Sequence, residues 1–205
     1  MINHNALSRI CIWISRIGCC RGFGIQSPWA YSFVRYVINE HYPYYAYGML
    51  RVVFSRWSVS ERKMGELYFR LVNFLQPSRV LFLFSPDDRL LGFRRKYISS
   101  GCSRCEFAEI EKLDGSWAEA NFNSRPLLVC CASSLVSADM IMSMVGRLRK
   151  GDMILVEDIK DNKDSRMMWR ELRNRLSGAL MFDLFYCGII YVDADRYMQH
   201  FKINF

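Results

Sequence analysis

The sequence predicts an α/β fold with a doubly wound, mostly parallel β-sheet and a helical extension in front of it. Three observations lead to this prediction. From about residue 77 onward, short apolar runs alternate with amphipathic segments. The runs are almost continuously apolar, as expected for strands that are buried on both faces of a parallel sheet. The last runs follow one another without a helix, so at least one pair there should be antiparallel.

Two parts of the chain are expected, a helical extension over residues 1–76 and a sheet domain over residues 77–205. Apolar periodicity, N-cap signals and a proline stop predict the helices of the extension. They should cover residues 7–17, 28–40 and 60–75. Between them, HYPYYAYG is expected to form an aromatic loop. Its Tyr45 and Tyr47 would either stack on a flat substrate or form an apolar lid.

The elements of the second part follow from the same patterns. The predicted strands are Arg79–Phe84, Cys105–Glu109, Pro126–Cys131, Met153–Glu157, Ala179–Phe185, Gly188–Val192 and Gln199–Phe205. The predicted helices are Arg89–Ser99, Gly115–Asn121, Ser137–Arg149 and Ser165–Leu176.

Composition limits the class of protein. Hydrophobic residues make up 51% of the 205 residues, which is enough for a substantial core. No apolar run approaches the roughly 18 residues that span a membrane. Arg9, Arg16 and Arg21 interrupt the first apolar segment, so it does not have the continuous centre of a secretory signal. Eight cysteines are too few for a disulfide scaffold, and reduced thiols in a cytoplasmic protein are expected.

The net charge of +8 allows two interpretations. Basic residues cluster at 94–96, 147–150 and 170–175, each on or beside a predicted helix. These clusters are either solvated helix faces or a surface for RNA or an anionic membrane. No metal site is expected, because Cys102 and Cys105 form a C-x-x-C with no second pair or histidine nearby.

The turn after the first predicted strand is the most informative segment. It reads PSRVLFLFSPDDRLLG, a strand, a tight turn and the start of a helix. Nucleotide-binding α/β domains begin in this way, with glycines in the turn so that the backbone can approach the ligand. Here Phe84, Ser85, Asp87 and Asp88 stand in and around the turn.

Other polar residues follow the next strands, where ligands of open α/β sheets bind. Glu109 and Glu111 follow the second strand, and Glu109 is either a ribose-binding acid or a solvated one. Cys131, Ala132 and Ser133 follow the third strand. Glu157 and Asp158 follow the fourth, where they would hold a metal, orient a substrate hydroxyl or cap the next helix.

The whole pattern resembles a family of small class I S-adenosylmethionine-dependent methyltransferases, which have a Rossmann-like sheet. The segments that carry the resemblance are RGFGIQSPWAYSFV, HYPYYAY, LYFRLVNFLQP, SRVLFLFSPDD, CEFAEIE, GDMILVEDI, FDLFYCGIIYV and MQHFKINF. The resemblance implies S-adenosylmethionine as cofactor, with contacts at Phe84, Ser85, Asp87, Glu109, Cys131 and Ala132. On the substrate side it implies Tyr45, Tyr47, Glu157 and Asp158, with an unknown small molecule as substrate. The resemblance assigns no catalytic residue. The helical extension over residues 1–76, which is rich in aromatic residues, would form a homodimer surface.

The chain also departs from this family at several cofactor contacts. Phe82 and Phe84 stand where the family has the acid and the glycine of the first strand and turn, and the stretch from Cys130 to Ala132 lacks the expected aspartate. The segment between Glu111 and Pro126 is too short for the usual middle strand and its helices. The first expectation is therefore a methyltransferase-like protein with a degenerate cofactor site and weak or no catalysis. The alternatives are an active methyltransferase and a non-catalytic basic binding module.

Overall fold

The computed structural model describes residues 6–19, 22, 24–85, 87–109, 126–195 and 197–205. These residues form two compact units. The first unit contains Pro77–Asp87 and Glu106–Lys202. The second contains the described residues up to Gln76, together with Asp88–Cys105 and Ile203–Phe205. The helix that follows the first strand therefore belongs to the second unit.

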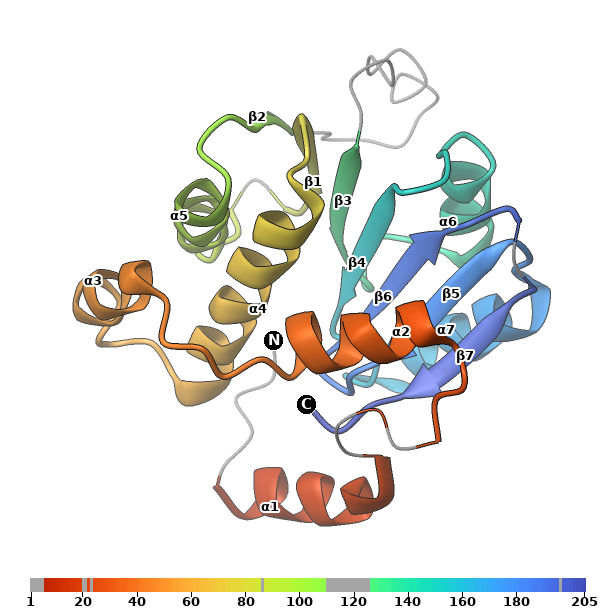
Figure 1. The fold of residues 1–205 in the computed structure, drawn as a ribbon, viewed down its shortest axis with the longest axis horizontal. Helices are drawn as coiled ribbons and strands as arrows, with labels where there is room; N and C mark the ends of the chain where they lie inside the picture. The colour runs from red at the N-terminus through yellow and green to blue at the C-terminus, as the bar shows by residue number, and fades with distance from the viewer. Residues whose placement is uncertain (1–5, 20–21, 23, 86, 110–125, 196) are drawn as a thin grey trace. The chain divides into compact units, whose positions relative to one another are not determined.

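The first unit is built on a β-sheet with the strand order β2-β1-β3-β4-β6-β5-β7 (Figure 1). The strands are β1 (Arg79–Leu83), β2 (Glu106–Glu109), β3 (Leu127–Ala132), β4 (Met153–Glu157), β5 (Ala179–Asp183), β6 (Cys187–Val192) and β7 (Gln199–Lys202). Strand β6 runs antiparallel to β4 and β5, and the other described pairs are parallel. The chain passes from β1 to β2 on one side and then to β3 on the other, which is the topology of a doubly wound, Rossmann-like sheet. The predicted fold class is confirmed.

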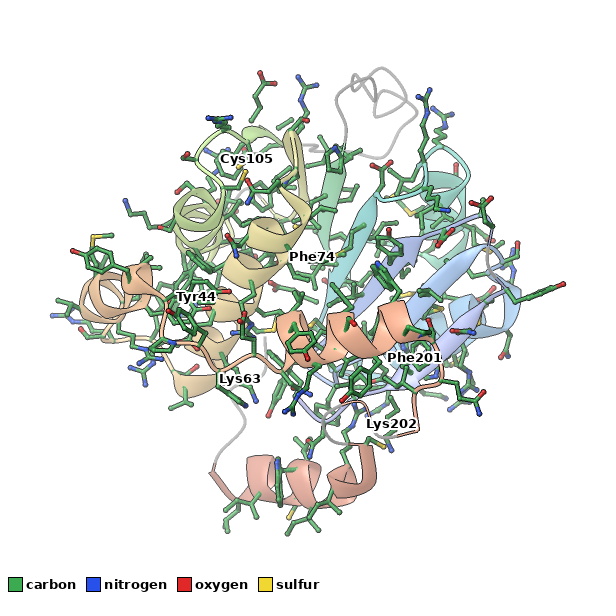
Figure 2. All side chains as sticks on the ribbon, in the orientation of Figure 1. Tyr44, Lys63, Phe74, Cys105, Phe201 and Lys202 are labelled. Carbon is green, nitrogen blue, oxygen red and sulfur yellow. The ribbon has the colours of Figure 1, made fainter. Side chains whose placement is uncertain are left out.

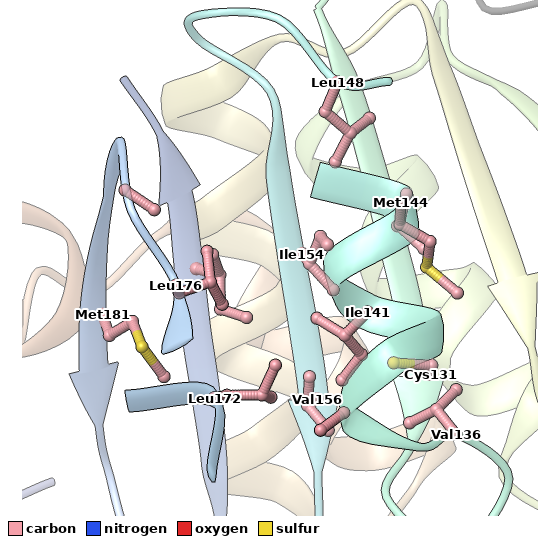
Figure 3. Packing of buried hydrophobic residues seen from close by; sticks show 14 of the residues in the cluster. Cys131, Val136, Ile141, Met144, Leu148, Ile154, Val156, Leu172, Leu176 and Met181 are labelled. Carbon is pink, nitrogen blue, oxygen red and sulfur yellow. The ribbon is translucent and has the colours of Figure 1, made fainter. Parts of the chain in front are cut away.

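Two helices, α6 (Ala138–Val145) and α7 (Lys163–Arg175), pack on one face of this sheet. Figure 3 shows the packing, with Ile141 of α6 and Leu172 of α7 against Ile154 and Val156 of β4. The strands contribute alternate residues to this cluster, because side chains along a strand point to opposite faces. Each fully buried side chain of this kind contributes roughly 1.5–3 kcal/mol. This cluster is the hydrophobic core of the first unit.

The described part of the second unit is helical. Its elements are α1 (Ala6–Ser15), η1 (Ile17–Cys19), α2 (Pro28–Phe33), η2 (Val34–Ile38), α3 (Tyr45–Val53), α4 (Val59–Leu75) and α5 (Leu91–Gly101). Ser27 caps α2 by accepting a hydrogen bond from the backbone of Ala30, as the Ser-Pro pair predicts. The following turn, η2, is a π-helix in which the Asn39 amide donates to the Val34 carbonyl. The α-helix α2 thus continues directly into the wider turn of the π-helix η2.

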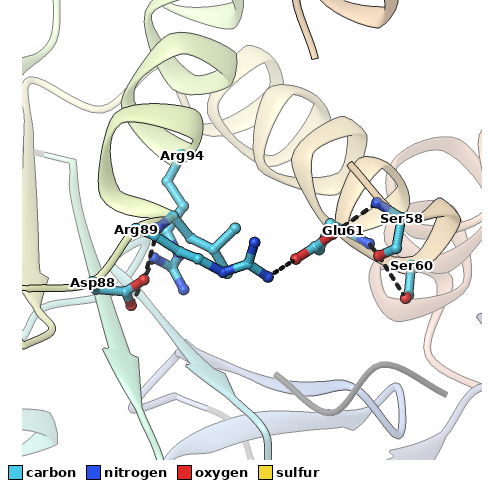
Figure 4. Close-up of polar contacts among 7 residues, drawn as sticks. Ser58, Ser60, Glu61, Asp88, Arg89 and Arg94 are labelled. Atoms are coloured by element: carbon cyan, nitrogen blue, oxygen red, sulfur yellow. Dashed lines mark hydrogen bonds and ion pairs between the residues drawn. The ribbon is translucent and has the colours of Figure 1, made fainter. Parts of the chain in front are cut away.

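Polar contacts fix α4 and α5 within the second unit (Figure 4). Ser58 and Glu61 form a capping box at the start of α4. Arg89 donates to the other oxygen of Glu61 at 2.6 Å. At the start of α5, Asp88 accepts from the backbone of Leu90 at 2.8 Å and from buried Arg94 at 3.0 Å. These acids therefore stabilise two helix starts.

One predicted loop is wrong in part. Residues 41–48 were expected to form an aromatic loop, but α3 begins at Tyr45. The reason lies in the spacing of Tyr47 and Leu50, which are both buried on one face of that helix. The predicted helix at residues 115–121 lies outside the described residues, as do Pro86 and Glu111.

The packing of Trp169 against Gly188 in the core of the first unit predicts how a methyl group at Gly188 changes stability. A Cβ atom at Gly188 of β6 would lie 2.2 Å from the indole of Trp169, which is fully buried. Gly188→Ala should therefore lower the free energy of unfolding by about 1–3 kcal/mol, because the indole would have to move in a packed core. Denaturant unfolding followed by circular dichroism measures this change.

Gly92→Ala is the matched control. Gly92 lies in α5, and a Cβ atom there would meet nothing within 4 Å. Alanine in a helix is more stable than glycine by roughly 0.5–1 kcal/mol, so this variant should be as stable as the wild type or more stable. Equal effects of the two substitutions would contradict the packing described for Gly188.

Candidate functional site

The carboxyl ends of β1, β2, β3 and β4 meet at one edge of the sheet, which we call the carboxyl edge. The register brings residues at these ends together: Phe82, next to the last residue of β1, pairs with Glu109 of β2, and Ala132 of β3 pairs with Glu157 of β4. Directly paired residues have their side chains on the same face of a sheet. Three of the residues predicted at strand ends, Glu109, Ala132 and Glu157, therefore lie along one edge and on one face.

Aromatic side chains occupy the β1 part of this edge. Phe82 lies between Glu109 and Cys130 in the register and is only 1% exposed. Its ring stacks on that of Phe107 at 5.7 Å between centroids and contacts that of Phe84 at 6.0 Å. Phe84 is 8% exposed. The β1 end of the edge is therefore a compact apolar wall.

The turn after β1 adds little polar chemistry to this wall. Ser85 and Asp87 are exposed. Asp88 belongs to the second unit, where it accepts the contacts at the start of α5. An adenosyl cofactor at this edge requires an acid for its ribose and a turn that the cofactor can approach closely. Glu109 is exposed, and its carboxylate is of the type that accepts hydrogen bonds from ribose hydroxyls. In contrast, β1 and the residue after it present the buried rings of Phe82 and Phe84.

At the end of β3, Cys131 points away from this face. It belongs to the hydrophobic core beneath α6, and its thiol donates to the carbonyl of Leu155 at 3.7 Å. Burial, with a smaller contribution from Glu157, raises the pKa of the Cys131 thiol. Only Ala132, which is half-buried, faces the same side as Phe82 and Glu157. The two neighbouring residues predicted as cofactor contacts therefore lie on opposite faces.

A buried polar network joins the ends of β3 and β4. Ser133 donates through its backbone to the Glu157 carbonyl at 3.0 Å. Its hydroxyl donates to the Asp158 carbonyl at 3.0 Å and lies 2.9 Å from the hydroxyl of Ser165 in α7. The sequence pointed to Ser133 but not to Ser165, which is 32 residues further along the chain. Each of these contacts fixes the backbone around the acidic pair.

Asp158 has a strained backbone and a perturbed carboxyl group. Its φ is +62°, and the nearby Phe185 has a φ of +75°. Left-handed conformations cost most residues with a Cβ, such as Phe185, roughly 1–2 kcal/mol, and Asp tolerates them better. Burial, followed by the charge of Glu157, raises the pKa of Asp158 from 3.8 to about 6. Strain and a shifted pKa in one residue are typical of functional sites.

The alternative that the acidic pair caps the next helix is wrong. Asn162 is the N-cap of α7, and its side-chain oxygen accepts a hydrogen bond from the backbone of Ser165 at 2.8 Å. Glu157 is the last residue of β4 and is buried. Asp158 follows it in the turn, where its backbone amide donates to the Tyr186 carbonyl at 2.7 Å. The pair therefore belongs to the carboxyl edge.

The two tyrosines predicted on the substrate side lie in the second unit. Tyr45 is fully exposed, whereas Tyr47 is buried. The hydroxyl of Tyr47 donates to the Glu66 carbonyl at 3.3 Å and accepts from Arg70 at 3.5 Å. Burial raises the pKa of Tyr47. Tyr45 and Tyr47, two positions apart in the predicted loop, thus differ: the first is exposed to solvent and the second is buried.

One basic residue of each predicted cluster is paired with an acid. Arg94 pairs with Asp88 at 3.0 Å, and Arg175 pairs with Asp139 at 2.7 Å. Lys150 lies 3.4 Å from Asp193.

The cysteines show no metal-binding arrangement within the described ranges. No group of three or more His, Cys, Asp and Glu side chains there is placed to hold an ion. The Cys105 thiol donates to the Cys102 carbonyl at 3.1 Å, and burial, with a smaller effect of Cys102, raises its pKa to about 11. In the same ranges, no helix is both long and apolar enough to cross a bilayer.

A cavity of about 790 Å³ lies at the other end of the sheet. The C-terminal part of α6 and the residues after it, the end of α7 and the residues before β5, and the end of β6 with the residues that follow line it. None of the predicted site residues is among the described residues that line it. The cavity is therefore separate from the carboxyl edge.

No family model matches the chain, and no curated protein matches it. Among solved structures, the chain is similar to the SAH-bound methyltransferase PaMTH1 of Podospora anserina. The two chains share 12% sequence identity, with a TM-score of 0.44, over 94% of this chain and 98% of the other.

Proposed function

We propose that this is a methyltransferase-like protein whose cofactor site at the carboxyl edge has degenerated, so that S-adenosylmethionine binding and catalysis are weak or absent. One observation carries the proposal. Phe82 is buried between Glu109 and Cys130, at the position where the family resemblance implies a cofactor-binding acid. Phe84, at the position of the turn glycine, packs its ring against Phe82.

The expected loss of affinity is large. Each charge-assisted hydrogen bond that is lost removes roughly 1.5–3 kcal/mol of binding free energy. About 1.4 kcal/mol corresponds to a tenfold change in affinity. Losing the β1 acid and the close approach at the turn would therefore weaken cofactor binding by about a hundredfold or more. The sheet keeps its stability, because phenylalanine rings bury more apolar area than the residues that they replace.

The polar half of the edge supports a second candidate, an active methyltransferase with an altered site. Glu109 is exposed at the end of β2, where it would hold the ribose. Glu157 and strained Asp158 would then position an acceptor hydroxyl or amine. Methyl transfer depends mainly on alignment of the acceptor with the sulfonium, so few catalytic side chains are required.

Calorimetric titration with S-adenosylmethionine and S-adenosylhomocysteine distinguishes these candidates. We expect no binding of either compound at micromolar concentrations, because the β1 wall removes two of the cofactor contacts. The same result is expected for Glu109→Ala. Micromolar binding by the wild type would overturn the proposal of a degenerate site.

If the wild type does bind, two matched variants decide whether Glu109 holds the ribose. Glu109→Ala should then lose about tenfold or more in affinity. Glu106→Ala removes the same group from the same strand, where it pairs with Arg79 at 2.6 Å, and should leave affinity unchanged. Equal effects of the two variants would exclude the ribose role of Glu109.

The raised pKa of Asp158 predicts how stability depends on pH. The folded protein holds this proton up to about pH 6, whereas the unfolded chain releases it near 3.8. The stabilising contribution of the protonated form is therefore complete below the unfolded value and is lost as pH rises through the folded value. Asp158→Asn replaces the carboxyl group by a neutral amide, so this loss of stability with rising pH no longer occurs. Asparagine also tolerates the left-handed backbone at this position. It should be more stable than the wild type near neutral pH, by about 1–3 kcal/mol, with little difference near pH 4.

Urea unfolding of both proteins across this pH range measures the difference. Asp87→Asn removes an exposed carboxylate of the same unit and is the matched control. An Asp158→Asn variant that gains no stability between acidic and neutral pH would show that the carboxyl group is not desolvated.

A further inference from the structure

The second unit contains a separate pocket of about 280 Å³. It lies between α2, η2 and the C-terminal half of α4, and Tyr44 and Phe74 of its walls are labelled in Figure 2. Its volume is near the lower end of the range for ligand pockets, roughly 300–1,000 Å³. A ligand enclosed there would contain one ring or a group of similar size.

Aromatic rings form its walls. Trp29 stacks on Phe33 at 5.2 Å, and Phe74 lies 5.4 Å from Phe33. Tyr44 also lines the pocket and packs against Phe69 at 4.9 Å. Such rings attract flat groups and cations through their π-electrons.

One carboxylate, that of Glu40, lies among the aromatic residues of the pocket. Glu40 lines the pocket, and its Oε2 accepts the hydroxyl of Tyr44 at 2.7 Å. Burial, followed by the Glu40 carboxylate, raises the pKa of Tyr44 to about 12, so the phenol stays protonated and donates. Within the described residues, the contact with Tyr44 leaves Oε1 of Glu40 for a donor on a ligand.

Arg70 is the cation that a ligand would meet, and it is engaged elsewhere. It is 6% exposed. Its Nε donates to the Val37 carbonyl at 2.7 Å and its Nη2 to the Ile38 carbonyl at 3.0 Å. These are the last carbonyls of η2, whose helix end carries partial negative charge. The guanidinium is therefore held by these two carbonyls, whereas the Glu40 carboxylate lines the pocket.

The wall that carries Tyr36 and Val37 is the π-helix η2. Single π-turns inside helices cost stability and occur frequently at functional sites. Here the wide turn directs the Val37 and Ile38 carbonyls to Arg70 and brings Glu40 to the pocket. This second observation is independent of the aromatic walls.

We propose that this pocket binds a small organic cation in which one methylene joins an ammonium group to an aromatic ring, with the ring against the aromatic side chains and the ammonium on Glu40. This site is independent of the carboxyl edge, and neither proposal requires the other.

Three probes of similar size and different charge test the proposal: benzylammonium, benzyl alcohol and benzoate. Calorimetry or ligand-observed NMR should show benzylammonium binding in the low-millimolar range or tighter, as about eight heavy atoms allow. Benzyl alcohol should bind at least about tenfold more weakly, and benzoate should not bind. Equal binding of the three probes, preference for benzoate, or no binding of benzylammonium would each overturn the proposal.

Variants assign the contacts. Glu40→Gln keeps an acceptor for Tyr44 and should weaken benzylammonium binding by about tenfold or more. Phe74→Leu should weaken it several-fold through loss of the ring. Glu66→Gln is the matched control, because Glu66 lies on the same unit but pairs with Arg51 at 2.8 Å outside the pocket. Unchanged affinity in Glu40→Gln, or an equal loss in Glu66→Gln, would contradict the assignment.

Discussion

Pairing of β1 with β2 on one side and β3 on the other is the constraint on which the first unit depends. The register fixes Phe82 between Glu109 and Cys130, and it places Leu81 and Leu83 in the core beneath α6 and α7. A shift by one residue would exchange the two faces of β1. The same pairing thus determines the core of the unit and the residues that the carboxyl edge presents.

This edge has an apolar part and a polar part. On β1 and β2, the rings of Phe82, Phe84 and Phe107 form a wall that stabilises the sheet and presents no acid on β1. On β3 and β4, buried serines hold a strained turn in which Asp158 has a raised pKa. A scaffold can lose ligand contacts on one strand while it keeps polar groups on the next, because the core beneath α6 and α7 uses the opposite face of these strands. The edge therefore joins buried rings and polar groups on one retained Rossmann-like sheet.

The sequence predicted the strands of the first unit well, because buried parallel strands such as Met153–Glu157 are continuous apolar runs with clear ends. The site was harder to predict. Cys131 and Ala132 both follow the third run, and only the register shows that Cys131 faces the core. The contact of Ser133 with Ser165, the left-handed backbone of Asp158 and the carbonyl contacts of Arg70 depend on tertiary packing. No local pattern signals them. The helix at Tyr45 was missed because its short apolar face lies in a run of tyrosines.

Restoring the chemistry of β1 tests the central claim most directly. Phe84→Gly alone and together with Phe82→Glu would give the turn its glycine and the strand its acid. Circular dichroism would establish folding, and titration with S-adenosylhomocysteine would measure affinity. If the rings have replaced cofactor contacts, the folded variants should bind at least about tenfold more tightly than the wild type. Folded variants that gain no affinity would contradict the view that this edge once held the cofactor.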